Sequence, residues 1–307
     1  MPAGCRRPSR PRSTPEAGGV DWARYAETWP NAEHSAFAQA RPHRWHVQAL
    51  GPAAAPVLLL LHGAGGATHS WRDLAPLLAR RWRVVAPDLP GHGFTRLGAL
   101  QRSSLDLMAA DLETLLEKRG ERPAAIVGHS AGGALALRMA QIAGSPPAAV
   151  VGINAALDNF DGAAGFLFPM MAKALALNPL VAPTMARLAQ PNTVQRLIEG
   201  TGSRLDDLGL ALYRACVSDA RHVDGTLTMM AQWRLDRLRA ALSRTAVPTL
   251  LLAAEGDRAV SPETSERAAR KMPRAEAVTL PGVGHLAHEE APEEVAARVD
   301  AFLKRHL

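Results

Sequence analysis

The segment that most constrains the fold is Gly-His-Ser-Ala-Gly-Gly, residues 128–133. It follows a short apolar run at residues 124–127 and precedes a helical pattern at residues 134–140. A strand that enters Gly-x-Ser-x-Gly and a helix that leaves it are the context of a nucleophile elbow, a strained turn that exposes a serine hydroxyl. Gly128 and Gly132 are small because the strand and helix backbones pass close together there. The pattern predicts an exposed Ser130 at the carboxyl edge of a sheet.

Other segments predict the rest of that sheet. Strands are expected at residues 57–61, 82–86, 149–153, 248–254 and 275–280, and the continuous apolar runs among them indicate burial on both faces. Residues 45–50 alternate and end at Gly51-Pro52, which is typical of an edge strand. Helical spacing occupies residues 70–78, with Ser70 as the expected cap, and residues 105–116, 263–271 and 292–307. Alternating strands and helices predict the α/β class, a doubly wound and mostly parallel sheet of about eight strands.

Composition divides the chain into three kinds of segment. Residues 1–19 are rich in Arg, Pro, Ser and Gly, and we expect them to form a disordered basic arm. Residues 158–245 contain no strand-like run and are cut by prolines into short helices, which predicts a helical cap inserted into the core. Residues 20–157 and 246–307 then form the α/β core, which a chain of 307 residues with 47% apolar residues can bury.

The charge and the cysteines exclude some classes of protein. The net charge is +6, and the basic arm supplies half of it through four arginines and one glutamate. The remainder is only mildly basic, and a nucleic-acid protein needs a basic face with interleaved aromatic residues. No apolar run is long enough to cross a bilayer. Cys5 and Cys216 are the only cysteines, and a structural disulfide is not expected, which favours the cytoplasm.

Three polar residues follow predicted parallel strands in the order Ser130, Asp257, His285. The carboxyl ends of parallel strands meet at one edge of the sheet, where such folds build their sites. A histidine can take the serine proton near neutral pH, and a buried carboxylate would fix the histidine tautomer. The developing oxyanion would accept hydrogen bonds from the amide of Ala131 at the helix N-terminus and from the amide of Ala64 in the His-Gly-Ala-Gly-Gly loop.

Two of these assignments have alternatives. His288 lies three residues beyond His285 and is either a surface histidine or the true base. Asp257 could instead cap the following helix, in which case Asp158, past the preceding strand, is the substitute acid. His285 and Asp257 are the preferred pair.

The remaining histidines are expected to be structural. His62 precedes Gly-x-Gly and more often braces such a loop than reacts, and Asp88 and His92 belong to Asp-Leu-Pro-Gly-His-Gly, a turn sequence. No two histidines have the i, i+4 spacing with a nearby acid that a zinc protease uses. We therefore expect neither a metal nor another cofactor.

The insertion is rich in large apolar side chains. Most of them are expected to form its own core, and some are expected to line a pocket above Ser130, because methionine adapts to bulky apolar ligands. The candidate walls are Phe166, Phe168, Met170, Met229, Met230 and Trp233.

These motifs together resemble the α/β-hydrolase superfamily across residues 40–307: HGAGG, DLPGHG, GHSAGG, the turn at Asp257 and GVGH. Longer stretches are similar to the magnesium-chelatase accessory proteins of bacteriochlorophyll biosynthesis, namely VLLLLHGAGGATHSWRDLAPLLARR, VVAPDLPGHGFT, LIEGTGSRLDDLGLALY and GVGHLAHEE. The third stretch lies in the insertion, which varies most between hydrolase subfamilies. The resemblance implies a photosynthetic bacterium and a link to magnesium insertion into protoporphyrin.

Two functions from different classes follow. In the first, the protein is a serine hydrolase that acts on an ester or related acyl bond of a bulky apolar substrate, such as a tetrapyrrole. In the second, it is a non-catalytic module that holds porphyrin or contacts magnesium chelatase. The complete triad favours the enzyme, although a fold does not fix a reaction.

Overall fold

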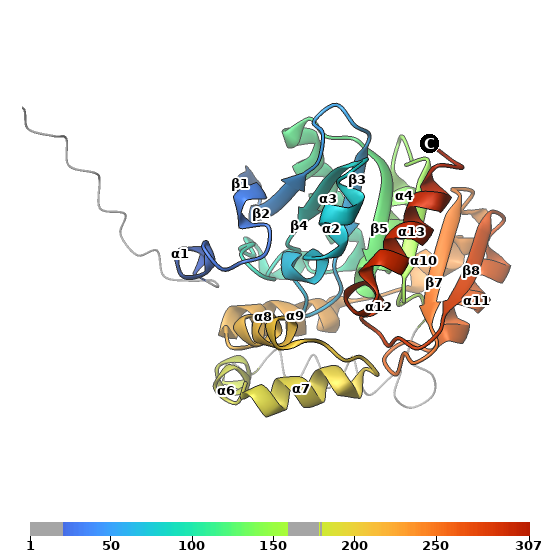
Figure 1. Ribbon diagram of the computed structural model, residues 1–307. Helices are drawn as coiled ribbons and strands as arrows, with labels where there is room; N and C mark the ends of the chain where they lie inside the picture. The colour runs from blue at the N-terminus through green and yellow to red at the C-terminus, as the bar shows by residue number, and fades with distance from the viewer. Residues whose placement is uncertain (1–20, 159–177, 179) are drawn as a thin grey trace, which may run out of the picture.

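The computed structural model describes residues 21–158, 178 and 180–307, and its strands form one eight-stranded sheet (Figure 1). The strand order is β1-β2-β4-β3-β5-β6-β7-β8, and every neighbouring pair from β4 to β8 is parallel. Only the pairs formed by β2 are antiparallel. The predicted α/β fold is confirmed. The strands are β1 (Ser35–Ala40), β2 (His43–Leu50), β3 (Val57–Leu61), β4 (Arg83–Pro87), β5 (Pro123–His129), β6 (Ala149–Ile153), β7 (Thr249–Ala254) and β8 (Ala275–Leu280).

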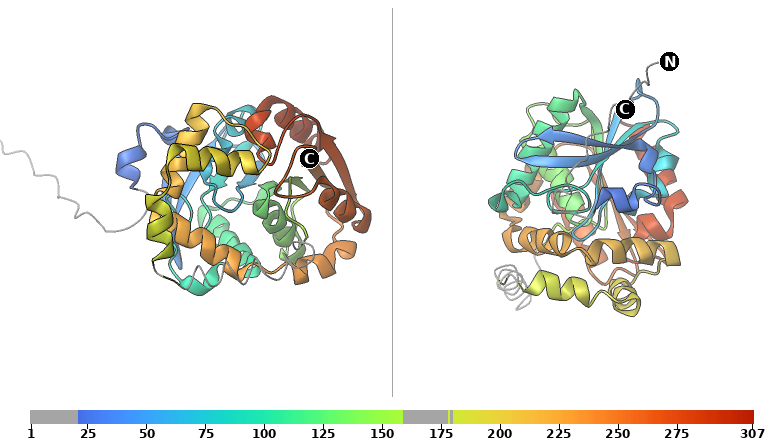
Figure 2. Two further views of the ribbon diagram at one scale, coloured as in Figure 1. Left: turned by 90° about the horizontal axis from the view of Figure 1, so that it is seen from below. Right: turned by 90° about the vertical axis from the view of Figure 1, so that its left-hand side faces the viewer.

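Helices cover both faces of the sheet (Figures 1 and 2). One face carries α2 (Leu74–Leu78) and α13 (Pro292–Leu303), and the other carries α3 (Leu105–Arg119), α4 (Ala131–Ile142) and α11 (Pro262–Lys271). The short α10 (Asp236–Ala241) packs against α4, although its residues belong to the segment expected to form the cap. Two further short helices are α1 (Trp22–Tyr25) and α12 (Ala287–Glu290).

The alternation of side chains in β3 shows how one strand serves two cores. Leu58 and Leu60 join the apolar cluster under α2 and α13, whereas Leu59 and Leu61 join the cluster under α3 and α4. All four are fully buried, and each stabilises the fold by about 2 kcal/mol relative to an exposed leucine. The continuous apolar run at residues 57–61 therefore does indicate a strand buried on both faces.

Two local expectations are wrong. The strand predicted at residues 45–50 is not an edge strand, because β1 pairs with it on the outer side. The sequence did not predict β1, because that strand has no run of β-branched residues and Phe37 is its only aromatic residue. Ser70 does not cap a helix. It lies in a 3-10 turn at Thr68–Trp71, and α2 starts only at Leu74.

Four helices lie across the carboxyl edge of the sheet, and we call them the cap helices: α6 (Val181–Arg187), α7 (Pro191–Gly200), α8 (Asp207–Val217) and α9 (Ala220–Gln232). In Figures 1 and 2, α8 and α9 lie next to the sheet, with α6 and α7 outside them. No strand is assigned within the described residues 180–245, and the expected division of the chain into a core and a cap remains a prediction. Residues 1–20, which include the expected basic arm, lie outside the described residues.

Helix α9 meets the core backbone to backbone. A Cβ on Gly225 would lie 2.2 Å from the carbonyl oxygen of Gly91. Gly91 itself has φ +80°, a conformation that side chains other than glycine rarely adopt. The close fit holds α9 against the loop that follows β4.

A buried polar cluster also joins the cap helices to the core. Glu289 accepts hydrogen bonds from Ser70 Oγ (2.5 Å) and from Tyr213 Oη of α8 (2.7 Å). Ser70 gives its one proton to Glu289, and so His288 Nε2, 2.9 Å away, donates to Ser70. Burial raises the pKa of Glu289 to about 7.

We expect Gly225→Ala to lower the free energy of unfolding by about 1–3 kcal/mol, because the new methyl group must push α9 from the core. Gly200→Ala is the matched control: it lies in helix α7, and nothing lies within 4 Å of the added Cβ. The higher helix propensity of alanine should raise the free energy of unfolding of Gly200→Ala by up to about 1 kcal/mol. Denaturant unfolding measures both values, and equal effects would contradict the packing argument.

Glu289→Gln should change how stability depends on pH. The pKa of Glu289 is raised above its usual 4.5 in the folded protein, so its contribution to stability is greatest below pH 4.5 and is lost as the pH rises to about 7. The free energy of unfolding of the wild type minus that of the variant should fall by an amount on the order of 3 kcal/mol across this window. A constant difference between pH 4.5 and 8 would refute the shift. Subtracting the variant cancels the contributions of the buried histidines.

Candidate active site

The turn between β5 and α4 has the strain expected of a nucleophile elbow. Ser130 has φ +51° and ψ −118°, a conformation that a non-glycine residue holds only when its surroundings force it. A Cβ on Gly128 would lie 2.1 Å from the Gly132 oxygen, and one on Gly132 would lie 2.0 Å from the Leu61 oxygen. The close approach that the sequence predicted at these glycines is present. Ser130 is consequently carried at the carboxyl end of β5, and it is half-buried.

The structure brings His285 and Asp257 together. His285 Nδ1 donates to Asp257 Oδ2 at 2.8 Å, because a carboxylate can only accept. The other carboxylate oxygen accepts from the amides of Ala259 and Val260, both at 2.8 Å. This turn holds the carboxylate, and the hydrogen bond from Nδ1 to Asp257 favours the neutral tautomer in which His285 Nε2 carries the lone pair.

Ser130 and His285 come from loops that touch through His129. His129 Nε2 donates to the His285 carbonyl at 2.8 Å, and the centroids of the two rings are 4.7 Å apart. Within the described residues, neither Ser130 Oγ nor His285 Nε2 has a hydrogen-bond partner. The structure therefore brings His285 to Asp257 but does not join Ser130 Oγ to His285 Nε2 by a hydrogen bond, and that contact remains a prediction.

Asn154 is a positioning residue that sequence reasoning missed. Its Nδ2 donates to the carbonyls of Gly284 (3.1 Å) and His285 (2.8 Å), and its Oδ1 accepts from the Ala254 amide (2.7 Å). The residue has φ +47° and is buried. A polar residue directly after the apolar run of β6, next to the elbow strand, was the available signal. Asn154 ties the His285 loop to the end of β7.

The two expected oxyanion donors lie on either side of the turn. Ala131 is the first residue of α4, and Ala64 is exposed in the loop after β3. Neither amide has a hydrogen-bond partner among the described residues. A Cβ on Gly63 would lie 3.0 Å from the Ser130 Cβ, so the Ala64 loop packs directly against the elbow.

His62 braces this loop, as expected. Its Nε2 accepts from the Leu89 amide at 2.9 Å, and so its Nδ1 donates to the Gly63 carbonyl at 2.8 Å. Burial lowers the pKa of His62, which keeps the ring neutral. The ring spans the loops after β3 and β4.

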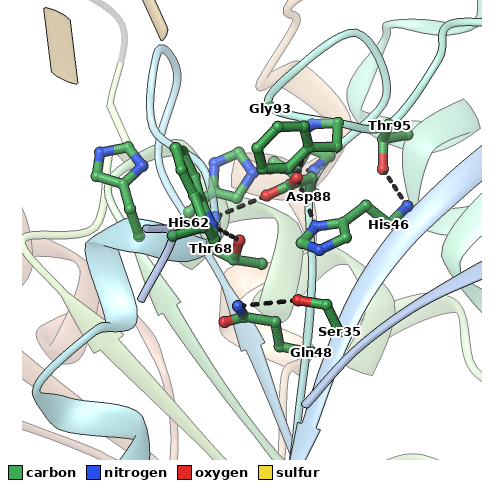
Figure 3. A network of polar contacts seen from close by, with 12 residues as sticks. Ser35, His46, Gln48, His62, Thr68, Asp88, Gly93 and Thr95 are labelled. Carbon is green, nitrogen blue, oxygen red and sulfur yellow. Dashed lines mark hydrogen bonds and ion pairs between the residues drawn. The ribbon is translucent and has the colours of Figure 1, made fainter. Parts of the chain in front are cut away.

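Asp88 fixes the loop after β4 (Figure 3). It is fully buried and accepts from His46 Nδ1 (2.8 Å) and from the amides of Thr68 (2.6 Å) and Phe94 (2.8 Å). Burial opposes the charge, but His46 and these hydrogen bonds hold the pKa of Asp88 below its ordinary value. His92 contacts the Pro90 carbonyl through Nδ1 (3.2 Å). Both residues serve the loop, which confirms their expected structural role.

The structure places the alternative base and acid elsewhere. His288 is fully buried, so it is not a surface histidine, and its Nε2 is engaged by Ser70. Burial lowers the pKa of His288 to about 3. Asp158 forms ion pairs with Arg239 (2.9 Å) and Arg267 (3.1 Å). Neither residue takes the place of His285 or Asp257 in the observed pair.

The expected pocket residues divide into two groups. Phe166, Phe168 and Met170 lie outside the described residues. Met229 is buried in the apolar cluster under α3 and α4, Trp233 packs against that cluster, and Met230 is half-buried. A pocket above Ser130 remains a prediction.

The described ranges contain neither a metal-binding cluster nor a membrane-spanning helix. No group of three His, Cys, Asp or Glu side chains there is arranged to hold a metal ion. No helix among the same residues is long and apolar enough to cross a membrane.

Known proteins resemble this chain in sequence and in fold. The family model described as "Alpha/beta hydrolase family" matches residues 58–298. The "Magnesium-chelatase 30 kDa subunit" of Rhodobacter capsulatus is 47% identical over 277 residues, which cover 90% of this chain and 96% of that protein. The "Dihydrolipoyllysine-residue acetyltransferase component of acetoin cleaving system" of Pseudomonas putida is 34% identical, over 94% of this chain and 72% of its own length.

The fold has close counterparts among solved structures. Epoxide hydrolase A from Mycobacterium thermoresistibile superposes with a TM-score of 0.70 at 22% identity, over 88% of this chain and 98% of that one. The resemblance drawn from the sequence motifs is confirmed by the family match and by the sequence relatives. This chain belongs to the α/β hydrolase family.

Proposed function

We propose that the protein is a serine hydrolase that cleaves an ester or related acyl bond in a bulky apolar substrate. The observation that carries the proposal is the 2.8 Å hydrogen bond from His285 Nδ1 to Asp257 Oδ2, on the sheet edge where the strained turn carries Ser130. A serine hydroxyl needs such a base to become a nucleophile. The proposed catalytic residues are Ser130, His285 and Asp257, and the proposed oxyanion donors are the amides of Ala64 and Ala131.

The proposed reaction has two steps. His285 Nε2 takes the Ser130 proton while Oγ attacks the carbonyl carbon of the substrate. The oxyanion that forms accepts hydrogen bonds from the amides of Ala64 and Ala131. The ester bond breaks, His285 protonates the departing oxygen, and an acyl group stays on Ser130. A water molecule, deprotonated by His285, then releases the acid and restores the hydroxyl. Asp257 stays ionised and stabilises the imidazolium in both steps.

We infer the class of substrate from the relatives and from the cap helices. The Rhodobacter capsulatus relative is named as a subunit of magnesium chelatase. We infer for this chain a role at the same step of (bacterio)chlorophyll biosynthesis in the cytoplasm, with a tetrapyrrole as substrate and a contact with magnesium chelatase. The half-buried Met230 and Trp233 are the described side chains that we assign to the pocket wall.

A second function is favoured by the same relative. A protein named as a chelatase subunit could work by binding alone, as a non-catalytic porphyrin carrier or accessory protein of the chelatase. The elbow and the ion pair would then be retained as parts of a binding site. The two functions differ in whether Ser130 reacts.

A fluorophosphonate probe distinguishes them, because it reacts only with an activated serine. We expect one equivalent of label on Ser130, found by peptide mass spectrometry, and no label in Ser130→Ala. His285→Ala should slow labelling by a factor of about 10³ or more, since the triad acts as a unit. His288→Ala is the matched control and should retain labelling.

Unlabelled wild-type protein that binds protoporphyrin tightly would favour the accessory function instead. Equal labelling rates in the wild type and in His285→Ala would show that His285 does not activate Ser130.

Trp233→Ala tests the proposed pocket. If Trp233 lines it, the variant should bind protoporphyrin about tenfold more weakly, because a large aromatic contact is lost, while its melting temperature changes by only a few degrees. Fluorescence quenching measures the affinity and circular dichroism measures the melting. A lower melting temperature with unchanged affinity would assign Trp233 to the core.

A further inference from the structure

His222, a histidine of the cap helices, contacts both the loop after β3 and the loop after β4. His222 lies in the first turn of α9, and Asp219, the N-cap, accepts hydrogen bonds from the amides of Arg221 (2.8 Å) and His222 (3.2 Å). The His222 side chain is buried and points into the core. Gly225, one turn further on, holds the helix against Gly91, as described above. The position of the ring is therefore set by the docking of α9.

The His222 ring joins these two loops with opposite hydrogen-bond polarity. Its Nδ1 accepts from the Gly93 amide at 3.0 Å, so the proton is on Nε2, which donates to the Gly65 carbonyl at 3.0 Å. Burial lowers the pKa of His222 to about 4, and the ring is neutral at neutral pH. Only the neutral ring can make both contacts.

The Gly65 carbonyl is connected to the proposed oxyanion donor through two planar peptides. The peptide that carries the Gly65 carbonyl also carries the Gly66 amide, which donates to the Gly63 carbonyl at 3.1 Å. The peptide that carries the Gly63 carbonyl also carries the Ala64 amide. Because a trans peptide is planar, its N–H points opposite to its C=O, and a held carbonyl sets the direction of the amide.

The loop needs such anchors. Ala64 is exposed, and Gly65 has φ +76° and flanks it with Gly63. Glycine-flanked peptides rotate at little steric cost, so an unheld Ala64 amide could turn away from the site. His62 anchors the Gly63 carbonyl from the core, and His222 anchors the Gly65 carbonyl from the cap.

We propose that His222 is a positioning residue through which α9 sets the direction of the Ala64 amide, so that the oxyanion hole is complete only while α9 is docked on the core. This inference rests on the proposed function, in which the Ala64 amide receives the oxyanion. It assigns the cap helices a role besides the proposed contribution of Met230 and Trp233 to the pocket wall. A movement of α9 away from the core would release the Gly65 carbonyl and switch off the site.

The test compares His222→Phe with His222→Gln by fluorophosphonate labelling. Phenylalanine keeps the ring volume but makes neither hydrogen bond, whereas glutamine can accept from Gly93 and donate to Gly65. Loss of one oxyanion donor costs about 10²–10³ in rate, and its misalignment should cost about ten- to a hundredfold. We expect the maximal labelling rate to fall by that factor in His222→Phe, with the half-saturating probe concentration unchanged, and to recover to within about fivefold in His222→Gln.

His69→Phe is the matched control. His69 is also fully buried at the cap, next to Tyr213 and with Nδ1 3.8 Å from Cys216 Sγ, but it makes no hydrogen bond to residues 63–66 in the described structure. It should label at the wild-type rate once both proteins are shown to be folded by circular dichroism. Equal slowing in His69→Phe and His222→Phe would reduce His222 to a structural role, and wild-type labelling in His222→Phe would overturn the proposal.

Hydrogen exchange keeps the inference testable if the wild type does not react. The Gly66 amide is protected by the Gly63 carbonyl, and loss of the His222 anchor should speed exchange in a peptide covering residues 62–67. His69→Phe should leave this exchange unchanged. An unlabelled wild type with faster exchange in His222→Phe would reject the hydrolase and retain the role of His222 in holding the loop, whereas unchanged exchange would reject that role.

Discussion

The structure depends on a contact between backbones at the end of β5. Gly128 lies against Gly132, and Gly132 lies against the Leu61 carbonyl, at distances that no Cβ could occupy. This contact forces the chain into the strained turn at Ser130, which no local preference of serine would produce. The strain is maintained because parallel strands on both sides of β5 and the packed face of α4 hold both ends of the turn.

The same topology explains how residues far apart in sequence meet. Ser130, Asn154, Asp257 and His285 each follow a strand of the parallel part of the sheet, β5 to β8, and so they emerge at one edge. Loops then set the final geometry. The His285 carbonyl is held by both Asn154 and His129, and the Asp257 carboxylate is held by two amides. The hydrogen bond between His285 and Asp257 therefore forms between residues that are already positioned.

Several buried histidines lie at the carboxyl edge of the sheet and join its loops. Burial lowers the pKa of His62, His129 and His222, and a neutral imidazole can donate from one nitrogen and accept at the other. Such a ring can join two loops without burying a charge, which would be costly. Two of these rings hold the loop of the proposed oxyanion hole, one from the core and one from the cap.

The parallel sheet, the strained turn and the candidates Ser130, His285 and Asp257 could be predicted from the amino-acid sequence, because apolar runs and glycine spacing are local signals. It did not reveal β1, whose residues have little strand preference, and it assigned Ser70 to a helix cap when that side chain is instead held by Glu289. The choice of His285 over His288 and of Asp257 over Asp158 needed the folded arrangement, because a hydrogen bond depends on where the loops bring two side chains. The same reason applies to Asn154 and His222, since no spacing within the chain records a contact made across more than 100 residues.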